Sequence, residues 1–197
     1  METDPEIVVR AVDGAELETL VPLLLLAEPG ERALRWSLAH LSDAVYRLDV
    51  AGAPDGARAA AATLRWEGDP SEIVELAIAP AWQGRGLGRR FLDWIVAEAS
   101  HRGKRAVEVG TANASLGNLA FYQRCGFRMH HVRRDYFSYY RTPRIEHGIE
   151  VRDLLVFRRD VGPRDGTRRS GAGAARHAAP AAAPRAGQPI GSPPVAP

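Results

Sequence analysis

Apolar and polar residues alternate with a period close to two in several short stretches of the chain, as in half-buried β-strands. Turn-forming residues separate the three such stretches between positions 44 and 78, so we expect these to pair as an antiparallel meander. The stretches expected to form strands are residues 6–12, 44–50, 58–66, 71–78, 105–109, 127–136 and 150–158.

Four other stretches repeat apolar residues every three or four positions, the pattern of one face of an amphipathic helix. Asp13 and Glu16 are typical of a capping box at the first of these helices, and Pro22 either kinks that helix or opens a second segment. The expected helices cover residues 14–26, 31–41, 87–100 and 116–125. The order of the elements, β-α-α-β-β-β-α-β-α-β-β, predicts an α/β fold of the α+β type.

The composition divides the chain into a domain at 1–160 and a tail at 161–197. The tail holds six Gly, seven Pro and ten Ala in 37 residues and no aromatic residue, so we expect it to be disordered. Its five Arg and one Asp give it a charge of +4, which leaves −2 on residues 1–160 out of the net +2. The domain charge therefore does not favour nucleic-acid binding, and association through the tail arginines is the alternative.

The sequence also bears on where the protein works. It has no apolar run of about 18 residues, so we expect no membrane span. Residues 1–6 are acidic and lack the apolar core of a signal peptide. Cys125 is the only cysteine, which excludes an internal disulfide and a zinc site built on several thiolates. We expect a cytoplasmic protein with no metal site, and the sequence leaves open whether it forms a homodimer.

A glycine-rich turn lies between the expected strand at 71–78 and the expected helix at 87–100. Such a junction presents unpaired backbone N–H groups and the positive end of the helix dipole, which together favour a phosphate or pyrophosphate. Its spacing matches neither a P-loop nor a Rossmann fingerprint, and an ordinary flexible turn is the alternative. The turn consists of Gln83, Gly84, Arg85, Gly86, Leu87, Gly88 and Arg89.

Two motifs together carry a family resemblance. The Gln-x-x-Gly-x-Gly pattern at 83–88 and the Tyr-x-x-x-Gly-Phe pattern at 122–127 resemble, in this order, the signatures of the GNAT superfamily of Gcn5-related N-acetyltransferases. The chain is similar to that family over residues 6–160, and in particular to a bacterial subgroup of it. The resemblance implies a mixed, mostly antiparallel sheet of about seven strands, with splayed central strands and about four helices packed on both faces.

The resemblance also implies that acetyl-CoA is the co-substrate. The glycine-rich turn would bind its pyrophosphate, and its pantetheine arm would contact the backbone of the strand at 71–78. A further contact would come from Asn113, Ser115 or Asn118, although Ser115 could instead act only as a helix cap. The implied cofactor-binding residues are Leu76, Ala77, Ile78, Gln83, Gly84, Arg85, Gly86, Leu87, Gly88, Arg89, Asn113, Ser115, Asn118 and Tyr122.

Acyl transfer from a thioester to an amine needs a proton acceptor for the amine and a proton donor for the leaving thiolate. A phenol stays protonated at neutral pH, and the resemblance implies that Tyr122 is this general acid; packing beside the cofactor is the alternative. For the base we favour Glu72, which stands where Gcn5-type enzymes carry their catalytic Glu. Glu75 and an ordered water are the other candidates. The odd separation of the two carboxylates predicts opposite faces of a regular strand.

We therefore expect an acetyl-CoA-dependent N-acetyltransferase that moves an acetyl group to a primary amine by direct transfer in a ternary complex. The alternative is a catalytically silent acyl-CoA-binding or regulatory module on the same fold. A covalent route through Cys125 is disfavoured, because no histidine is paired with it in the sequence. The acceptor would be a small-molecule or peptide amine, chosen in part by the aromatic and basic loop at 137–148.

Overall fold

The computed structural model describes residues 5–53 and 58–162, so the predicted disorder of the tail lies outside the described residues. The four predicted helices and seven predicted strands all form, with small shifts at their ends. The elements are β1 (Ile7–Ala11), α1 (Gly14–Leu24), α2 (Glu31–His40), β2 (Ala44–Val50), β3 (Arg58–Arg65), β4 (Ser71–Ile78), η1 (Pro80–Trp82), α3 (Leu87–His101), β5 (Ala106–Ala112), α4 (Leu116–Arg124), β6 (Arg128–Arg133), β7 (Ile145–Glu146), β8 (Ile149–Glu150) and β9 (Leu154–Asp160).

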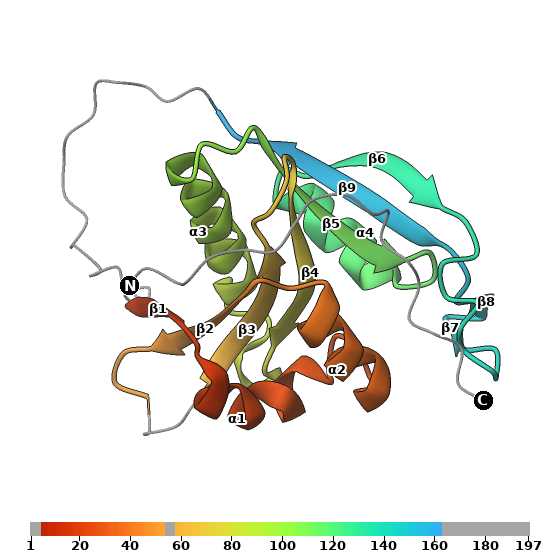
Figure 1. Ribbon diagram of the computed structural model, residues 1–197, viewed down its shortest axis with the longest axis horizontal. Coiled ribbons are helices and arrows are strands. Elements are labelled where there is room, and N and C mark those ends of the chain that lie inside the picture. Colours follow the sequence, from red (N-terminus) through yellow and green to blue (C-terminus); the bar gives the residue numbers. More distant parts are fainter. Residues whose placement is uncertain (1–4, 54–57, 163–197) are drawn as a thin grey trace.

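The core of the fold is a seven-stranded sheet in the order β1-β2-β3-β4-β5-β9-β6. All neighbours are antiparallel except β4 and β5, which run parallel. Helices α1 and α2 cover one face, and α3 and α4 cover the other (Figure 1). This arrangement of a mixed sheet with helices on both faces is the predicted one.

The apolar positions of the helices explain this layering. In α3, residues spaced three and four apart are buried against the sheet, among them Phe91, Ile95 and Ala99. Helix α1 buries Leu20 and Leu24, which pack with Leu34 of α2. Each helix therefore presents one apolar stripe to the sheet, as their sequence periodicity predicts.

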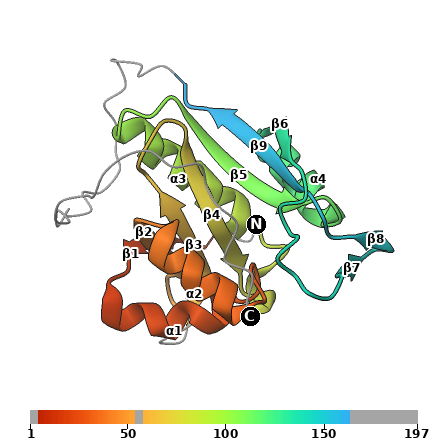
Figure 2. The same cartoon turned by 45° about the vertical axis from the view of Figure 1, so that its right-hand side comes forward.

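The two central strands separate soon after they pair. Only Ser71–Ile73 of β4 aligns with β5, opposite Val107–Val109, whereas the antiparallel pairing of β4 with β3 continues to Ile78. Figure 2 shows β4 and β5 diverging from this common end. The predicted splay of the central strands is thus present, and it leaves one edge of β4 without a neighbouring strand from Val74 onward.

Several local details differ from the sequence predictions. Asp13 is the N-cap of α1 but makes no side-chain cap bond, and Glu16 forms an ion pair with Arg47 instead of closing a capping box. Helix α1 runs through Pro22 as one helix. The final strand, β9, begins and ends later than predicted. The short β7–β8 hairpin was not predicted, because strands of two residues carry no periodic signal.

Candidate functional site

One cavity of about 940 Å³ occupies the space where β4 and β5 diverge. Its lining includes β4 from Glu72 to Ile78 and β5 from Val109 to Ala112. It also includes residues of α3 and α4, from one face of the sheet, and Trp36 and Ser37 of α2, from the other. The cavity therefore passes through the sheet, and its two ends open on different faces.

The glycine-rich turn forms one wall of this cavity. Gly86 is the N-cap of α3 and adopts a left-handed backbone with φ 75°, and Gly84 has φ 73°. The first bond that closes the helical turn runs from Arg90 N–H to Gly86 O, 3.2 Å, so the N–H groups before Arg90 have no acceptor within the helix. Nothing lies within 4 Å of a Cβ placed on Gly84 or Gly86. The turn thus offers open space beside unpaired amides, which fits a pyrophosphate.

The predicted turn residues divide into two groups. Gln83, Gly84 and Gly86–Arg89 line the cavity. Arg85 lies outside the lining, and its guanidinium stacks over the Trp82 ring at 5.1 Å. Gly88 is needed for close packing, because a Cβ there would lie 3.0 Å from Cζ of Phe121 in α4.

Tyr122 reaches the cavity from α4 and is only 6% exposed. Its ring packs among Phe121, Phe127 and Phe157 with centroid distances of 5.3–6.1 Å. Burial, and to a smaller extent the nearby Cys125, raises the pKa of the phenol above its ordinary value. The Tyr122 phenol is therefore neutral at the cavity wall throughout the physiological pH range.

Glu75 is a buried carboxylate in the lining of the cavity. Its side chain is buried, and the hydroxyl groups of Ser37 and Thr63 donate to its two carboxylate oxygens. Burial raises the pKa of Glu75 to about 7; the charges of Glu28 and Glu72 add to the increase, and the Ser37 hydrogen bond opposes it. A carboxylate with a pKa near neutrality is suited to accept a proton from an amine.

Glu72 has a different environment from Glu75. Its side chain is 15% exposed and forms ion pairs with Arg65 and, at 3.5 Å, with Arg133. Both carboxylates lie on the α2 face of the sheet, because the register with β3 shifts between Thr63 and Leu64. The expectation that an odd separation places them on opposite faces is therefore wrong: this β-bulge adds one residue to β4 and restores Glu72 to the face of Glu75.

The exposed edge of β4 offers main-chain groups to the cavity. Ala79 N–H donates to Ala59 O of β3 at 2.9 Å, and Glu75 N–H donates to Thr63 Oγ1 at 3.0 Å. Because the direction of main-chain groups alternates along a strand, the N–H groups of Leu76 and Ile78 point the other way, toward the gap. Ala77 N–H points toward β3.

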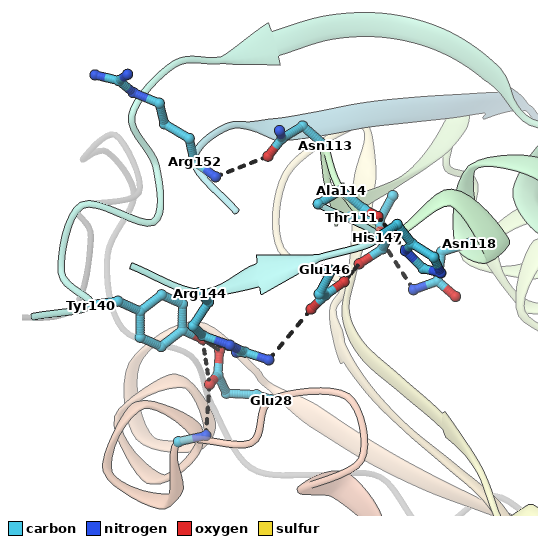
Figure 3. A network of polar contacts seen from close by, with 12 residues as sticks. Glu28, Thr111, Asn113, Ala114, Asn118, Tyr140, Arg144, Glu146, His147 and Arg152 are labelled. Atoms are coloured by element: carbon cyan, nitrogen blue, oxygen red, sulfur yellow. Dashed lines mark hydrogen bonds and ion pairs between the residues drawn. The ribbon is translucent and has the colours of Figure 1, made fainter. Parts of the chain in front are cut away.

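Three residues near the start of α4 were predicted as alternatives for one cofactor contact. Asn113 does not line the cavity: its side-chain amide donates to Glu150 O at 2.9 Å and accepts from Asp153 N–H. It also accepts from Arg152 N–H at 2.9 Å (Figure 3). Ser115 and Asn118 do line it. Ser115 Oγ makes no cap bond and donates to Glu146 Oε2 at 2.7 Å. Asn118 Nδ2 donates to Thr111 Oγ1 at 3.2 Å.

The sequence analysis did not single out Glu28, which lines the cavity from the segment between α1 and α2. Its carboxylate accepts hydrogen bonds from Gly30 N–H at 2.8 Å and from the hydroxyls of Tyr139 and Tyr140 at 2.9–3.2 Å. The network continues from Tyr140 through Arg144 to Glu146 (Figure 3). These hydrogen bonds hold the loop after β6 against Glu28 on the α2 side of the cavity.

Other candidate chemistry receives less support. Cys125 is buried in the core, burial raises its pKa, and it is absent from the cavity lining. Among residues 5–53 and 58–162, no group of His, Cys, Asp and Glu is arranged to hold a metal ion. Within the same residues, no helix has the length and apolar character needed to span a bilayer.

The chain matches the model of the acetyltransferase (GNAT) family over residues 28–127. It is 30% identical over 139 residues to YvbK of Bacillus subtilis, an uncharacterised N-acetyltransferase, covering 70% of this chain and 86% of that protein. A Bacillus subtilis acetyltransferase solved in complex with CoA aligns with a TM-score of 0.68 and 27% identity, over 79% of this chain and 99% of that chain. A GNAT family acetyltransferase from Elizabethkingia anophelis with acetyl-CoA bound aligns with a TM-score of 0.67 and 26% identity, over 78% and 97%.

The chain belongs to the GNAT family of acetyltransferases. Its splayed strands, glycine-rich turn and cavity are therefore those of an acyltransferase, and two of its structural relatives bind CoA or acetyl-CoA.

Proposed function

We propose that the protein transfers an acetyl group from acetyl-CoA directly to a primary amine. The observation that carries this proposal is that one cavity, passing through the sheet, is lined both by Glu75 and by Tyr122. A proton acceptor and a proton donor on opposite walls of one space are what a single-step transfer between two bound substrates needs. Acetyl-CoA supplies the acyl group as a thioester.

The α3 side of the cavity suits the donor substrate. The amides that precede Arg90, together with the side chains of Gln83 and Arg89, would hold the pyrophosphate. Leu76 and Ile78 would offer main-chain groups to the pantetheine arm, and the Leu76 N–H would polarise the thioester carbonyl. Asn118 lines the same side and would make the further contact predicted at the start of α4.

The α2 side suits the amine. Glu75 would accept a proton from the amine, whose nitrogen forms the new bond to the acyl carbon as the bond from carbon to sulfur breaks. The Tyr122 hydroxyl would give its proton to the departing sulfur. Glu75 is preferred to Glu72 as the base because its pKa is raised to about 7, whereas two guanidinium groups pair with Glu72.

The direct test is release of free CoA from acetyl-CoA by the purified chain, measured with a panel of amines and peptide N-termini. Acetylated amine should appear in a one-to-one ratio with free CoA. Saturable binding of acetyl-CoA without release for any amine would contradict the proposal and would indicate a silent acyl-CoA-binding module.

A further inference from the structure

The α2 side of the cavity combines negative charge with aromatic rings. Glu28, Glu72 and Glu75 come from different parts of the chain and lie close enough for the charges of Glu28 and Glu72 to raise the pKa of Glu75. All three charges also raise the pKa of Tyr136, which lines the same cavity. The three carboxylates therefore surround one region.

Glu28 differs from the other carboxylates in its partners. Its three hydrogen-bond donors, Gly30 N–H and the hydroxyls of Tyr139 and Tyr140, are all neutral groups. By contrast, Glu72 is paired with two arginines, and Glu146 with Arg144. Among residues 5–53 and 58–162, no cationic side chain forms an ion pair with Glu28, and Arg144 reaches it only through the Tyr140 hydroxyl. An unpaired carboxylate in a half-buried position is costly unless a cation approaches it.

The two tyrosines that bind this carboxylate belong to a cluster of four aromatic side chains. Tyr139 and Tyr140 have ring centroids 4.4 Å apart, and Phe137 stacks on Tyr140 at 6.0 Å with an interplanar angle of 8°. Tyr136 meets Phe137 edge-on at 5.1 Å. Aromatic faces attract positive charge, and burial keeps the tyrosines neutral by raising the pKa of each.

The structure already holds one cation in these surroundings. The Arg144 guanidinium lies over the Tyr140 ring at 5.0 Å and donates to its hydroxyl at 3.0 Å (Figure 3). Its charge is balanced by Glu146, 3.4 Å away, rather than by Glu28. A tyrosine ring face and a carboxylate of this region thus already hold one cationic group of this chain.

We propose that the amine acceptor carries a second positively charged group, and that Glu28 with the ring of Tyr139 binds that group. The reacting amine would lie beside Glu75, and the second cation would lie toward Glu28. The inference rests on the proposed function and narrows its substrate class to diamines, polyamines or amines borne on a basic peptide. All of these substrates are amines that carry a second positively charged group close enough to lie in the same cavity.

The test uses three series of amines of matched chain length, from propane to octane: α,ω-diamines, ω-amino alcohols and ω-amino acids. Binding to the full chain saturated with CoA is measured by calorimetry, and turnover by release of CoA. We expect the best diamine to bind about tenfold more tightly than the amino alcohol of the same length, and the amino acid to bind most weakly. Equal binding of diamine and amino alcohol, or preference for the amino acid, would overturn the inference.

Two variants locate the effect. Glu28→Gln keeps an oxygen acceptor and removes the charge, so it should weaken diamine binding about tenfold and leave the amino alcohols within about twofold. Glu31→Gln is the matched control, because Glu31 is an exposed residue of α2 that pairs with Arg35 and does not line the cavity. Equal weakening of all three series in Glu28→Gln would show a merely structural role and overturn the inference.

Another variant keeps the test decisive if Glu28→Gln folds poorly. Tyr139→Leu removes an aromatic face and one hydroxyl donor to Glu28 without changing any charge, and it should reduce the preference for diamines over amino alcohols. No change in that preference would contradict the role of the ring. If no amine releases CoA, the proposed function is contradicted, but calorimetry still tests the inference through the binding of the amines. If amines are acetylated without preference for a second cation, the inference alone is contradicted.

Discussion

Glu72 and Glu75 lie on the same face of β4 although they are three positions apart, which in a regular strand would place them on opposite faces. A bulge opposite Thr63 and Leu64 adds one residue to β4 and brings them to the same face. On that face the two carboxylates have different surroundings. Glu72 is held by Arg65 and Arg133, near the end where β4 still pairs with β5. Glu75 comes after the strands part, where its carboxylate borders the cavity.

Glu75→Gln should lower kcat about 10²- to 10⁴-fold, since it removes the proposed general base. The pKa of Glu75 is raised to about 7, and only its deprotonated form can accept a proton, so kcat/KM of the unaltered chain should fall as pH decreases through about 7. That inflection should be absent from Glu75→Gln. Steady-state rates measured between about pH 5 and pH 9 check both statements.

Glu72→Gln is the matched control for that experiment. It should reduce the rate much less than Glu75→Gln and leave the inflection near pH 7 in place, shifted slightly downward, because Glu72 contributes to raising the pKa of Glu75. A larger loss of rate in Glu72→Gln than in Glu75→Gln would reverse the assignment of the base.

Ser37→Ala should move the inflection upward. The Ser37 hydroxyl donates to Glu75 and lowers its pKa, opposing the effect of burial. Without that bond the pKa should rise further above 7, so more alkaline buffer would be needed for half-maximal kcat/KM. An unchanged pH profile would indicate that Ser37 does not position the active carboxylate, whatever happens to the absolute rate.

Glu75→Gln should also change stability in a pH-dependent manner. The folded pKa of Glu75 is raised, so the stability from its protonated form is fully present below about 4.5 and is lost as pH rises through about 7. The variant should therefore match the unaltered chain near pH 4 and exceed it near pH 8, by on the order of 2 kcal/mol. Thermal unfolding at both pH values measures this; a difference that is constant with pH would contradict it.

Tyr122→Phe should lower kcat at least about tenfold while leaving the affinity for acetyl-CoA within about twofold. Phenylalanine keeps the ring packing against Phe127 and Phe157 and removes only the hydroxyl that would protonate the sulfur. Calorimetry of acetyl-CoA binding, together with steady-state kinetics, separates these effects. Undiminished kcat would exclude Tyr122 as the general acid.

Gly86→Asp should raise the dissociation constant for acetyl-CoA about tenfold or more, because it places a carboxylate where the pyrophosphate would bind. Gly52→Asp is the control for backbone strain. Both glycines have φ 75° and open space around a Cβ, but Gly52 does not line the cavity. Both variants should lose about 1 kcal/mol of stability, and only Gly86→Asp should lose affinity. Equal affinities for acetyl-CoA would place its pyrophosphate elsewhere.

Much of this architecture could be predicted from local sequence. Periodicity identified the helices and the seven strands of the sheet, and the Gln-x-x-Gly-x-Gly pattern at 83–88 identified the turn that starts α3. Those features depend on residues close together in the chain. The predicted capping box at Asp13 was wrong, because a local pattern cannot anticipate a distant partner. Glu16 forms an ion pair with Arg47, which only the folded sheet brings near.

The sequence by itself determined the family, the order of the elements and the two candidate carboxylates, because these are properties of motifs and of periodic patterns. Only the tertiary structure distinguishes the surroundings of the two carboxylates. A bulge shifts the register of β4, the approach of α2 buries Glu75 beside Ser37, and two arginines engage Glu72. The contact of Glu28 with Tyr139 and Tyr140, more than a hundred residues away, likewise arises only from folding. Burial and charge pairing depend on such distant neighbours, which no local pattern specifies.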